Sequence, residues 1–390
     1  METAIINANI ITPLEIIKKS AVLIDGGKIR KILKNGEKIP EGAELIDAKG
    51  KILCPGFIDL HLQGGGGADV IEDTFEAINC VSSTHMKYGT TSFLATTNTG
   101  LRRGGRSKNE EFLHLKPIVQ AIKNGTDGAQ ILGIHIEGPF INPERKGMIR
   151  GDYVRKPDLQ ELRKIIKICG GKLKMMTIAP ELRGNLVLIR ELVKGGIIAS
   201  LGHTNATYEE AMKGIEAGIS HATHMFNAMS GLHHREPAAA NACLDSNISI
   251  QLIADFVHVH PAVVKLVLKV KGPDKVALIT DAIMAVGMPD GVYEASSQKI
   301  NVKNGIARRK DGVLAGSTFP LNRMVRSMVS LGFSLQDAIK MASLTPAKIL
   351  KMENKKGIIK EGMDADLILI DENINVYMAM IRGKVVWTKK

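Results

Sequence analysis

The sequence predicts an α/β fold, a (β/α)8 barrel of the TIM type, with a small β-sandwich domain built from both ends of the chain. Three observations support this prediction. Eight short apolar runs alternate with helical patterns through the middle of the chain, carboxylate or imidazole residues close several of these runs, and both chain ends carry β-type runs. A barrel of this type takes roughly 250 residues, so the 390-residue chain leaves room for a second, smaller domain.

Both ends of the chain carry short β-type runs. They lie at residues 4–7, 20–25 and 28–33 near the N-terminus, and at 365–370, 376–380 and 384–387 near the C-terminus. Asp25-Gly26-Gly27 is a signal for a tight hairpin. Because isolated hairpins are only marginally stable, we expect the two ends to pair into one domain of residues 1–54 and 356–390. Residues 55–355 then form the barrel.

The eight apolar runs of the middle segment read as buried strands, at residues 57–62, 91–96, 131–137, 175–179, 197–203, 219–224, 248–255 and 276–281. Helical spacing lies between most of them, as at 158–167 and 208–217. A doubly wound open sheet is the alternative, but no GxGxxG motif follows the first run. Residues 102–106 read as an exposed loop, residues 287–316 as an inserted hairpin, and helical spacing returns from 319 to about 350.

Composition places the chain among ordinary globular proteins, with 44% hydrophobic and 24% charged residues. No apolar run approaches the roughly 20 residues that span a bilayer, and the first residues lack the pattern of a signal peptide. The four cysteines lie far apart without a CxxC pair, which argues against a disulfide framework and against a thiolate metal site. We therefore expect a cytoplasmic protein without a membrane partner.

The formal net charge of +12 is compatible with nucleic acid, an anionic surface or an acidic small substrate. The basic residues are spread through every segment, and only 4% of residues are aromatic, which is too few for base-stacking platforms. Nucleic acid is therefore not an expected partner. Two interpretations stay open, a lysine-rich solvated surface and a field that attracts a phosphorylated substrate.

Three potential metal ligands each follow an apolar run: Glu137, His203 and His224. Taken singly, each has a simpler explanation as a rim, capping or core residue. Together they lie at the ends of the third, fifth and sixth predicted strands, and catalytic groups of TIM barrels gather at these ends. Three protein ligands leave one coordination position open for water, as in catalytic zinc sites. Zinc is the default ion, although iron, cobalt and manganese accept the same ligands.

Two further groups belong to this prediction. His61 and Gln63 share one face of the first strand, since side chains alternate. Glutamine is a poor ligand, so we expect one well-held ion; a second, weaker site through His61 stays open, as does a hydrogen-bonding role for it at the barrel mouth. Asp281 ends the eighth run, where a carboxylate could take a proton from water and pass it to a leaving group. The alternative for Asp281 is a helix cap.

An ordered set of motifs resembles the N-acetylglucosamine-6-phosphate deacetylase family of the amidohydrolase superfamily. Each motif is modest, but together they run through nearly the whole chain in order. They are Cys54-Pro-Gly-Phe-Ile-Asp-Leu-His61, Gly133-Ile-His-Ile-Glu-Gly-Pro-Phe140, Ser200-Leu-Gly-His-Thr204, His221-Ala-Thr-His-Met-Phe-Asn-Ala228, His233-His-Arg-Glu-Pro237, Leu278-Ile-Thr-Asp-Ala282 and Leu314-Ala-Gly-Ser317.

The resemblance implies hydrolysis of the N-acetyl group of a 6-phosphorylated amino sugar, giving acetate and the free amine. It implies that Glu137, His203 and His224 bind the metal and that Asp281 is the general base and acid. Positions that match substrate-binding residues are Asn227, Ala228, Arg235, His258, Leu314, Ala315 and Gly316. The arginine that matches Arg235 reaches the phosphate in the neighbouring subunit, which implies a homodimer. The galacto epimer or another small amide as substrate, and a non-catalytic phosphosugar-binding protein, stay open as alternatives.

One position departs from the family pattern. Twelve residues after the metal-binding glutamate, the family places a histidine or glutamine that polarises the acetyl carbonyl. In this chain that substrate-facing position is Ile149, which has no side-chain donor. Either the ion alone polarises the carbonyl, or Lys146 or Arg150 takes over this role, or the substrate differs somewhat.

Overall fold

The computed structural model describes residues 2–34, 36–98, 112, 114–295 and 298–389. All eight predicted barrel strands are present, hydrogen-bonded in one sheet in chain order from the first to the last. They are β6 (Phe57–Leu62), β9 (Thr90–Asn98), β10 (Gln130–Glu137), β11 (Leu173–Ile178), β12 (Ile198–Leu201), β13 (His221–Ala222), β14 (Ser249–Leu252) and β15 (Val276–Leu278). Each neighbouring pair is parallel.

The sheet closes between its first and last strands. Leu62 forms a parallel bridge with Ala282, and the backbone N–H of Asp281 donates to the carbonyl of His61 at 2.9 Å. The N–H of Gln63 donates to the carbonyl of Ala282 at 2.9 Å. These bonds form a seam that completes the barrel, so the predicted fold class is confirmed.

Several strands end earlier than their apolar runs predict, and three of them end just before a predicted site residue. Strands β12, β13 and β15 end at Leu201, Ala222 and Leu278, two or three residues before the polar residue of interest. His203, His224 and Asp281 have positive φ angles of 49°, 26° and 51°. A left-handed residue cannot continue a β ladder, so the chain turns at each of these positions.

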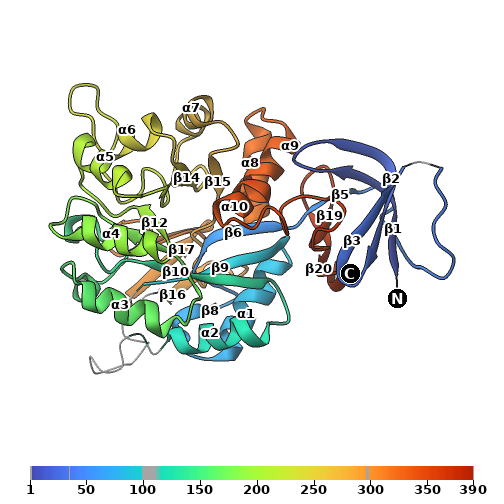
Figure 1. The fold of residues 1–390 in the computed structure, drawn as a ribbon, viewed down its shortest axis with the longest axis horizontal. Helices are drawn as coiled ribbons and strands as arrows, with labels where there is room; N and C mark the ends of the chain where they lie inside the picture. The colour runs from blue at the N-terminus through green and yellow to red at the C-terminus, as the bar shows by residue number, and fades with distance from the viewer. Residues whose placement is uncertain (1, 35, 99–111, 113, 296–297, 390) are drawn as a thin grey trace.

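Among the residues that the structure describes, seven α-helices lie between successive barrel strands, and Figure 1 shows them around the sheet. They are α1 (Phe75–Met86), α2 (Leu115–Asn124), α3 (Leu159–Ile168), α4 (Asn185–Lys194), α5 (Tyr208–Glu216), α6 (Ala239–Asp245) and α7 (Pro261–Lys271). Both helices predicted from spacing, α3 and α5, are confirmed. Asp158 caps α3, and Thr207 forms a capping box with Glu210 at the start of α5. In the described part of the chain, no helix is both long and apolar enough to cross a membrane.

The segment after the last barrel strand forms a three-stranded antiparallel sheet where the sequence predicts a hairpin. Its strands are β16 (Gly291–Ala295), β17 (Gln298–Lys303) and β18 (Ile306–Arg309). The helical spacing that follows is confirmed as α8 (Leu321–Ser330), α9 (Leu335–Ala342) and α10 (Leu344–Ile349). A short ribbon of β7 (Gly64–Gly65) and β8 (Ala68–Asp69) follows the first barrel strand. The loop predicted at residues 102–106 lies outside the described residues.

Both chain ends pair in one further sheet, as predicted. Its strands are β1 (Thr3–Ile11), β2 (Ile16–Asp25), β3 (Lys28–Leu33), β4 (Glu44–Asp47), β5 (Ile52–Pro55), β19 (Leu367–Ile370), β20 (Val376–Ile381) and β21 (Lys384–Thr388). The predicted hairpin turn lies at Gly26 and Gly27, between β2 and β3. These strands enclose a separate core that includes Ile5, Ile10, Val22, Leu53 and Leu367. Both termini therefore lie in the small domain (Figure 1), while the boundaries at residues 54 and 356 stay a prediction.

A buried ion cluster fastens the segment after α10 to the terminal sheet. The side chain of Lys356 is 2% exposed, and its Nζ pairs with Asp366 and, at 3.3 Å, with Asp364. Asp364 also pairs with Lys28 of β3, which is half exposed. The cluster thus joins chain segments that lie more than 300 residues apart.

Candidate metal centre and active site

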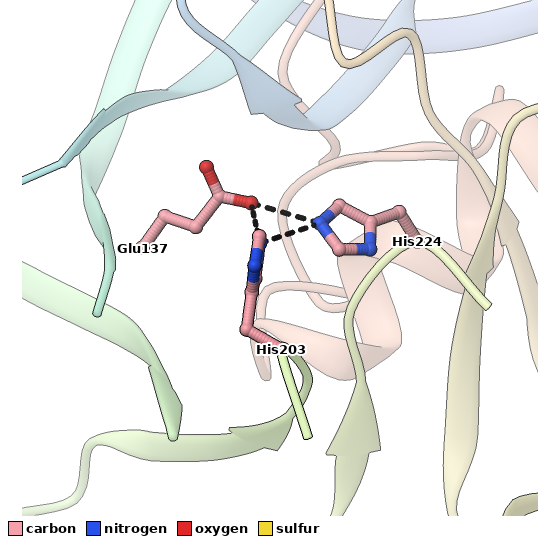
Figure 2. Close-up of side chains that lie close together, drawn as sticks. All are labelled: Glu137, His203 and His224. Carbon is pink, nitrogen blue, oxygen red and sulfur yellow. Dashed lines mark hydrogen bonds and ion pairs between the residues drawn. The ribbon is translucent and has the colours of Figure 1, made fainter. Parts of the chain in front are cut away.

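Three potential metal ligands converge at the carboxyl ends of the barrel strands (Figure 2). Glu137 is the last residue of β10, whereas His203 and His224 each lie two residues beyond their strand. Oε1 of Glu137 is 2.9 Å from Nε2 of His203 and 2.8 Å from Nε2 of His224, and the two imidazole nitrogens are 3.1 Å apart. All three side chains are buried. The predicted metal ligands therefore meet at one point.

The protonation of His203 suits a metal ion. Its Nδ1 is 2.7 Å from the carbonyl oxygen of Arg145. A carbonyl only accepts, so Nδ1 carries the proton and the lone pair of neutral His203 lies on Nε2, facing Glu137 and His224. Two imidazole nitrogens and a carboxylate oxygen, buried within 4.8 Å of one another, match the ligand set of a catalytic zinc-type ion. The residues at this site thus fit the divalent ion that the sequence predicts.

Three of the site residues have a strained backbone conformation. The left-handed conformations of His203, His224 and Asp281 each cost about 1–3 kcal/mol for a residue other than glycine. Hydrogen bonds hold each one: the N–H of Asn142 donates to the carbonyl of His203 and that of Ser317 to the carbonyl of Asp281, both at 2.9 Å. The N–H of His224 donates to Oε1 of Gln251 at 3.2 Å. The fold therefore stabilises a conformation that these residues would not adopt alone.

Asp281 lies beside the three ligands and contacts two residues of the first strand. Its Oδ1 accepts a hydrogen bond of 3.0 Å from Nε2 of Gln63 and lies 3.2 Å from Nε2 of His61. His61 Nε2 is also 3.5 Å from Oε1 of Glu137. The structure therefore brings His61 and Asp281 to the metal ligands, as predicted.

The charges of this cluster stabilise one another. Burial alone would raise the pKa of Glu137, but the imidazoles of His61 and His203 hold that pKa well below its usual range. Burial would likewise raise the pKa of Asp281, and His61 again lowers it. For His61, burial would lower the pKa, but the carboxylates of Asp281 and Glu137 raise it well above its usual value. Both carboxylates are therefore ionised near neutral pH.

A cavity of about 420 Å³ opens over these residues. This volume suits a small-molecule ligand. Most of the predicted substrate-binding residues line it together with the metal ligands and Asp281: Ile149, Asn227, Ala228, His258, Leu314, Ala315 and Gly316. His61 is fully buried and is not among the residues that line the cavity. Arg235 does not line it; the residue is exposed, with Nη1 at 2.8 Å from Nε2 of His234.

His258 lines the cavity, and a hydrogen bond to Asp255 fixes its imidazole ring. Its Nδ1 is 2.7 Å from Oδ2 of Asp255, whose Oδ1 accepts from the backbone N–H groups of Val257 and His258. Burial would lower the pKa of His258, but the Asp255 carboxylate outweighs it and raises that pKa above its usual value. The carboxylate therefore fixes the ring and favours its cationic form.

The position of Ile149 is apolar in the structure. Its side chain packs against Ile141 and Tyr153, and Met148, Ile283 and Val313 line the cavity beside it. The guanidinium of Arg150 binds Asp152 through two hydrogen bonds of 3.0 and 2.7 Å. Neither Arg150 nor Lys146 is among the residues that line the cavity. The structure therefore offers neither of the substitutes considered for the missing donor.

The inserted sheet is hydrogen-bonded to a loop that lines the cavity. Nε2 of Gln298 donates to the carbonyl of Met148 at 2.5 Å, and Nη1 of Arg309 donates to the carbonyl of Gly147 at 3.4 Å. These bonds join the inserted sheet to the loop after β10, which carries Ile149. Leu314 to Gly316, at the end of the insertion, line the cavity itself.

Sequence reasoning missed three contributors to the site. Arg145 lines the cavity and orients His203 through its carbonyl oxygen. Asp255 holds His258, and its place at the end of the seventh run, three residues before a histidine, was a signal that could have revealed it. Gln251, whose side chain contacts His61 and His224, lies within a buried strand and carries no such signal.

Comparison with known proteins gives a consistent result. The sequence profile of the Amidohydrolase family matches residues 52–386. An N-acetylglucosamine-6-phosphate deacetylase from Bacillus subtilis is 37% identical over 383 residues, 98% of this chain and 96% of that protein. An N-acetylgalactosamine-6-phosphate deacetylase from Escherichia coli O157:H7 is 36% identical over 350 residues, 89% of this chain and 90% of that protein.

Solved structures agree with the fold. A mutant N-acetyl-D-glucosamine-6-phosphate deacetylase from Mycobacterium smegmatis, solved in complex with N-acetyl-D-glucosamine-6-phosphate, superimposes with a TM-score of 0.91 at 30% sequence identity. The match covers 99% of this chain and 100% of that one. The likeness therefore extends over the barrel and the terminal sheet alike.

Proposed function

The chain belongs to the amidohydrolase family, and from this premise we propose that it hydrolyses the N-acetyl group of N-acetylglucosamine 6-phosphate, giving glucosamine 6-phosphate and acetate. One observation carries the proposal beyond the likeness of sequences. Glu137, His203 and His224 meet at a single point, and Asp281 lies beside them in a cavity of the size of a sugar phosphate. A hydrolase of this type needs such a combination of metal ligands and a proton carrier.

Glu137, His203 and His224 are proposed to hold one divalent ion, with zinc as the default and iron, cobalt or manganese accepted by the same ligands. When bound, such an ion lowers the pKa of water and polarises a carbonyl group. His61 lies within 3.5 Å of Glu137 and is proposed as the ligand through which a second, weaker site would form.

Asp281 is proposed as the general base and then the general acid. Its carboxylate takes a proton from the water that attacks the acetyl carbonyl carbon. It then delivers this proton to the amide nitrogen as the carbon–nitrogen bond breaks, so that the amine leaves and acetate remains. Gln63 and His61 hold Oδ1 of Asp281 during both steps.

Other residues that line the cavity are proposed to bind the phosphorylated sugar. His258, paired with Asp255, supplies a positive charge, and Asn227, Ala228 and the stretch from Leu314 to Gly316 supply further contacts. Arg235 is exposed and does not line its own cavity, which fits a role in the site of a second subunit in a homodimer. A guanidinium binds phosphate in bidentate fashion, and the net charge of +12 attracts an anionic substrate.

The cytoplasm is the proposed location. The four cysteines are all free, and three of them are buried. Unpaired buried thiols are typical of a reducing compartment.

The galacto epimer is a second candidate substrate, since the N-acetylgalactosamine-6-phosphate deacetylase of Escherichia coli O157:H7 is 36% identical to this chain. A non-catalytic sugar-binding protein is disfavoured because Asp281 is in place beside the metal ligands.

The proposal is tested by measuring acetate release from both 6-phosphorylated epimers, with metal analysis of the same protein. We expect a higher kcat/KM for the gluco epimer, loss of activity on removal of the metal by a chelator, and recovery when zinc is returned. A higher kcat/KM for the galacto epimer would select the second candidate. No acetate from either sugar by metal-loaded protein would refute the proposed activity.

A further inference from the structure

Gln251 is a fully buried polar residue in the interior of the barrel, on strand β14. Its side-chain oxygen, Oε1, is 3.1 Å from Nδ1 of His61 and 3.2 Å from the backbone nitrogen of His224. Its amide nitrogen, Nε2, is 3.5 Å from the sulfur of Met175. One oxygen atom therefore contacts a proposed metal ligand and the histidine next to the proposed site.

The orientation of this amide follows from its partners. The backbone N–H of His224 can only donate, so the Gln251 atom facing it must be the oxygen. The same oxygen faces Nδ1 of His61, so Nδ1 must donate and carries a proton. Nε2, which faces the carboxylates of Glu137 and Asp281, is then the nitrogen that would give up its proton to offer a lone pair to an ion. The network fixes a histidine tautomer that the position of the ring alone leaves open.

The hydrogen bond from the N–H of His224 to Gln251 holds a residue whose backbone is strained. His224 has a φ angle of 26°, and the oxygen of Gln251 binds the N–H of this same residue. The backbone carbonyl of Gln251 also accepts from the N–H of Met225 at 2.9 Å. Residue 251 thus holds two successive residues of the turn that aims Nε2 of His224 at Glu137.

We propose that Gln251 is a positioning residue of the metal centre, which holds His224 and His61 so that Nε2 of both rings faces Glu137. Outer hydrogen bonds of this kind typically change metal affinity 10–100-fold when they are removed. The inference rests on the metal centre of the proposed function but not on the identity of the substrate.

The test measures zinc affinity by competition with a chelating dye, so it needs no substrate. Gln251→Met removes the acceptor at nearly constant volume, whereas Gln251→Glu keeps an acceptor in the same place. We expect Gln251→Met to lower affinity about 10–100-fold and Gln251→Glu to stay within about threefold of the parent. Met175→Leu is the matched control, because it alters only the contact of the amide nitrogen, and we expect its affinity to match that of the parent.

A second measurement reads the tautomer. In the zinc-loaded parent protein, ¹⁵N NMR of His61 is expected to show a proton on Nδ1. An unprotonated Nδ1, or a Gln251→Met protein that binds zinc as tightly as the parent, would overturn the inference. If Gln251→Met does not fold, Gln251→Asn, whose amide is one methylene too short to reach, is measured in its place with the same expectation.

The two proposals fail separately. A parent protein that binds zinc, loses affinity on Gln251→Met and releases no acetate would retain this inference and refute the deacetylase. A parent protein that releases acetate, and whose zinc affinity does not change on Gln251→Met, would retain the deacetylase and refute this inference.

Discussion

The side-chain amide of Gln63 donates a hydrogen bond of 3.0 Å to Oδ1 of Asp281, the same oxygen that lies 3.2 Å from Nε2 of His61. Among the described residues, the hydrogen bonds and ion pairs of the Asp281 side chain thus fall on Oδ1. Oδ2 is left for a water molecule in the cavity. Oδ1 therefore fixes the orientation of the carboxylate, and Oδ2 stays available to accept a proton.

Asp281→Asn should reduce kcat about 10²–10⁴-fold, because an amide cannot take up the proton of the attacking water. Asp281 is not one of the three proposed ligands, so zinc content should not change. Acetate release and metal analysis of the same preparation check both points. Undiminished acetate release would refute the proposed mechanism.

The His258–Asp255 pair predicts a pH dependence of binding. Asp255 raises the pKa of His258, so the ring stays cationic to higher pH than a free histidine. KM for the phosphorylated sugar should therefore rise as the pH rises through that raised pKa. In Asp255→Asn the rise should begin at lower pH. Identical pH profiles of KM for the two proteins would show that His258 does not bind the phosphate as a cation.

The same pair predicts a window of stability. A raised histidine pKa contributes stability that is complete below the unfolded value of roughly 6.5 and is lost as the pH rises through the folded pKa. Asp255 has a lowered pKa, because hydrogen bonds from His258 outweigh burial; its contribution is complete above roughly pH 4 and is lost at lower pH. The parent should exceed Asp255→Asn in free energy of unfolding most clearly between these limits. Urea unfolding at several pH values measures this difference.

Ile149→His should raise kcat, because it supplies a donor at the position where the family polarises the acetyl carbonyl. One hydrogen bond of about 1.4 kcal/mol in the transition state corresponds to about tenfold in rate. Ile149→Leu keeps the apolar contacts with Ile141 and Tyr153 and is the control. If kcat is the same in all three proteins, the carbonyl is polarised elsewhere.

If Arg235 acts in the site of the neighbouring subunit, two inactive or weakened variants should restore activity to each other in mixed dimers. Arg235→Met should raise KM, because the phosphate of the neighbouring subunit loses a bidentate partner. Asp281→Asn should be nearly inactive. Mixed dimers of the two contain one site with both an intact Asp281 and an Arg235 from the other subunit. Co-expressed subunits should therefore exceed either variant in kcat/KM, whereas activity equal to the average of the two would place Arg235 outside the neighbouring site.

Lys356→Met should destabilise the protein by about 3–5 kcal/mol, because Asp364 and Asp366 would lose their buried partner. Lys28→Met is a matched control. It removes the other partner of Asp364, a half-exposed lysine whose pair should contribute no more than about 1 kcal/mol. Denaturant unfolding measures both, and equal losses would contradict the importance of burial.

Much of the fold could be predicted because a buried strand requires a run of apolar residues in the sequence. Both faces of a parallel barrel strand are covered, so runs such as residues 131–137 are almost wholly apolar and stand out. The ends of runs were less predictable. Residues 202–203 and 223–224 look like a continuation of their strands. The left-handed turn at His203 is held by a hydrogen bond from Asn142, and that at His224 by the side chain of Gln251, and neither partner is local in sequence.

The residues of the candidate site also fall into those that could be predicted from the sequence and those that could not. Residues at or just beyond the end of a strand, such as Glu137 and Asp281, could be found because their position along the chain fixes their position in the barrel. Gln251 could not, since its partner His61 lies 190 residues away and no local pattern links them. The third strand of the inserted sheet, β18, was missed because its run, Ile306-Ala-Arg-Arg309, is short and polar.

The seam of the barrel also bears on how the protein is made. Thr280 and the carbonyl of His61, joined across this seam, lie 219 positions apart in the chain. A ribosome must therefore release most of the polypeptide before the first strand can meet the last. Until then the nascent chain has Glu137, His203 and His224 but not Asp281, so all three candidate metal ligands are synthesised before the proposed proton carrier.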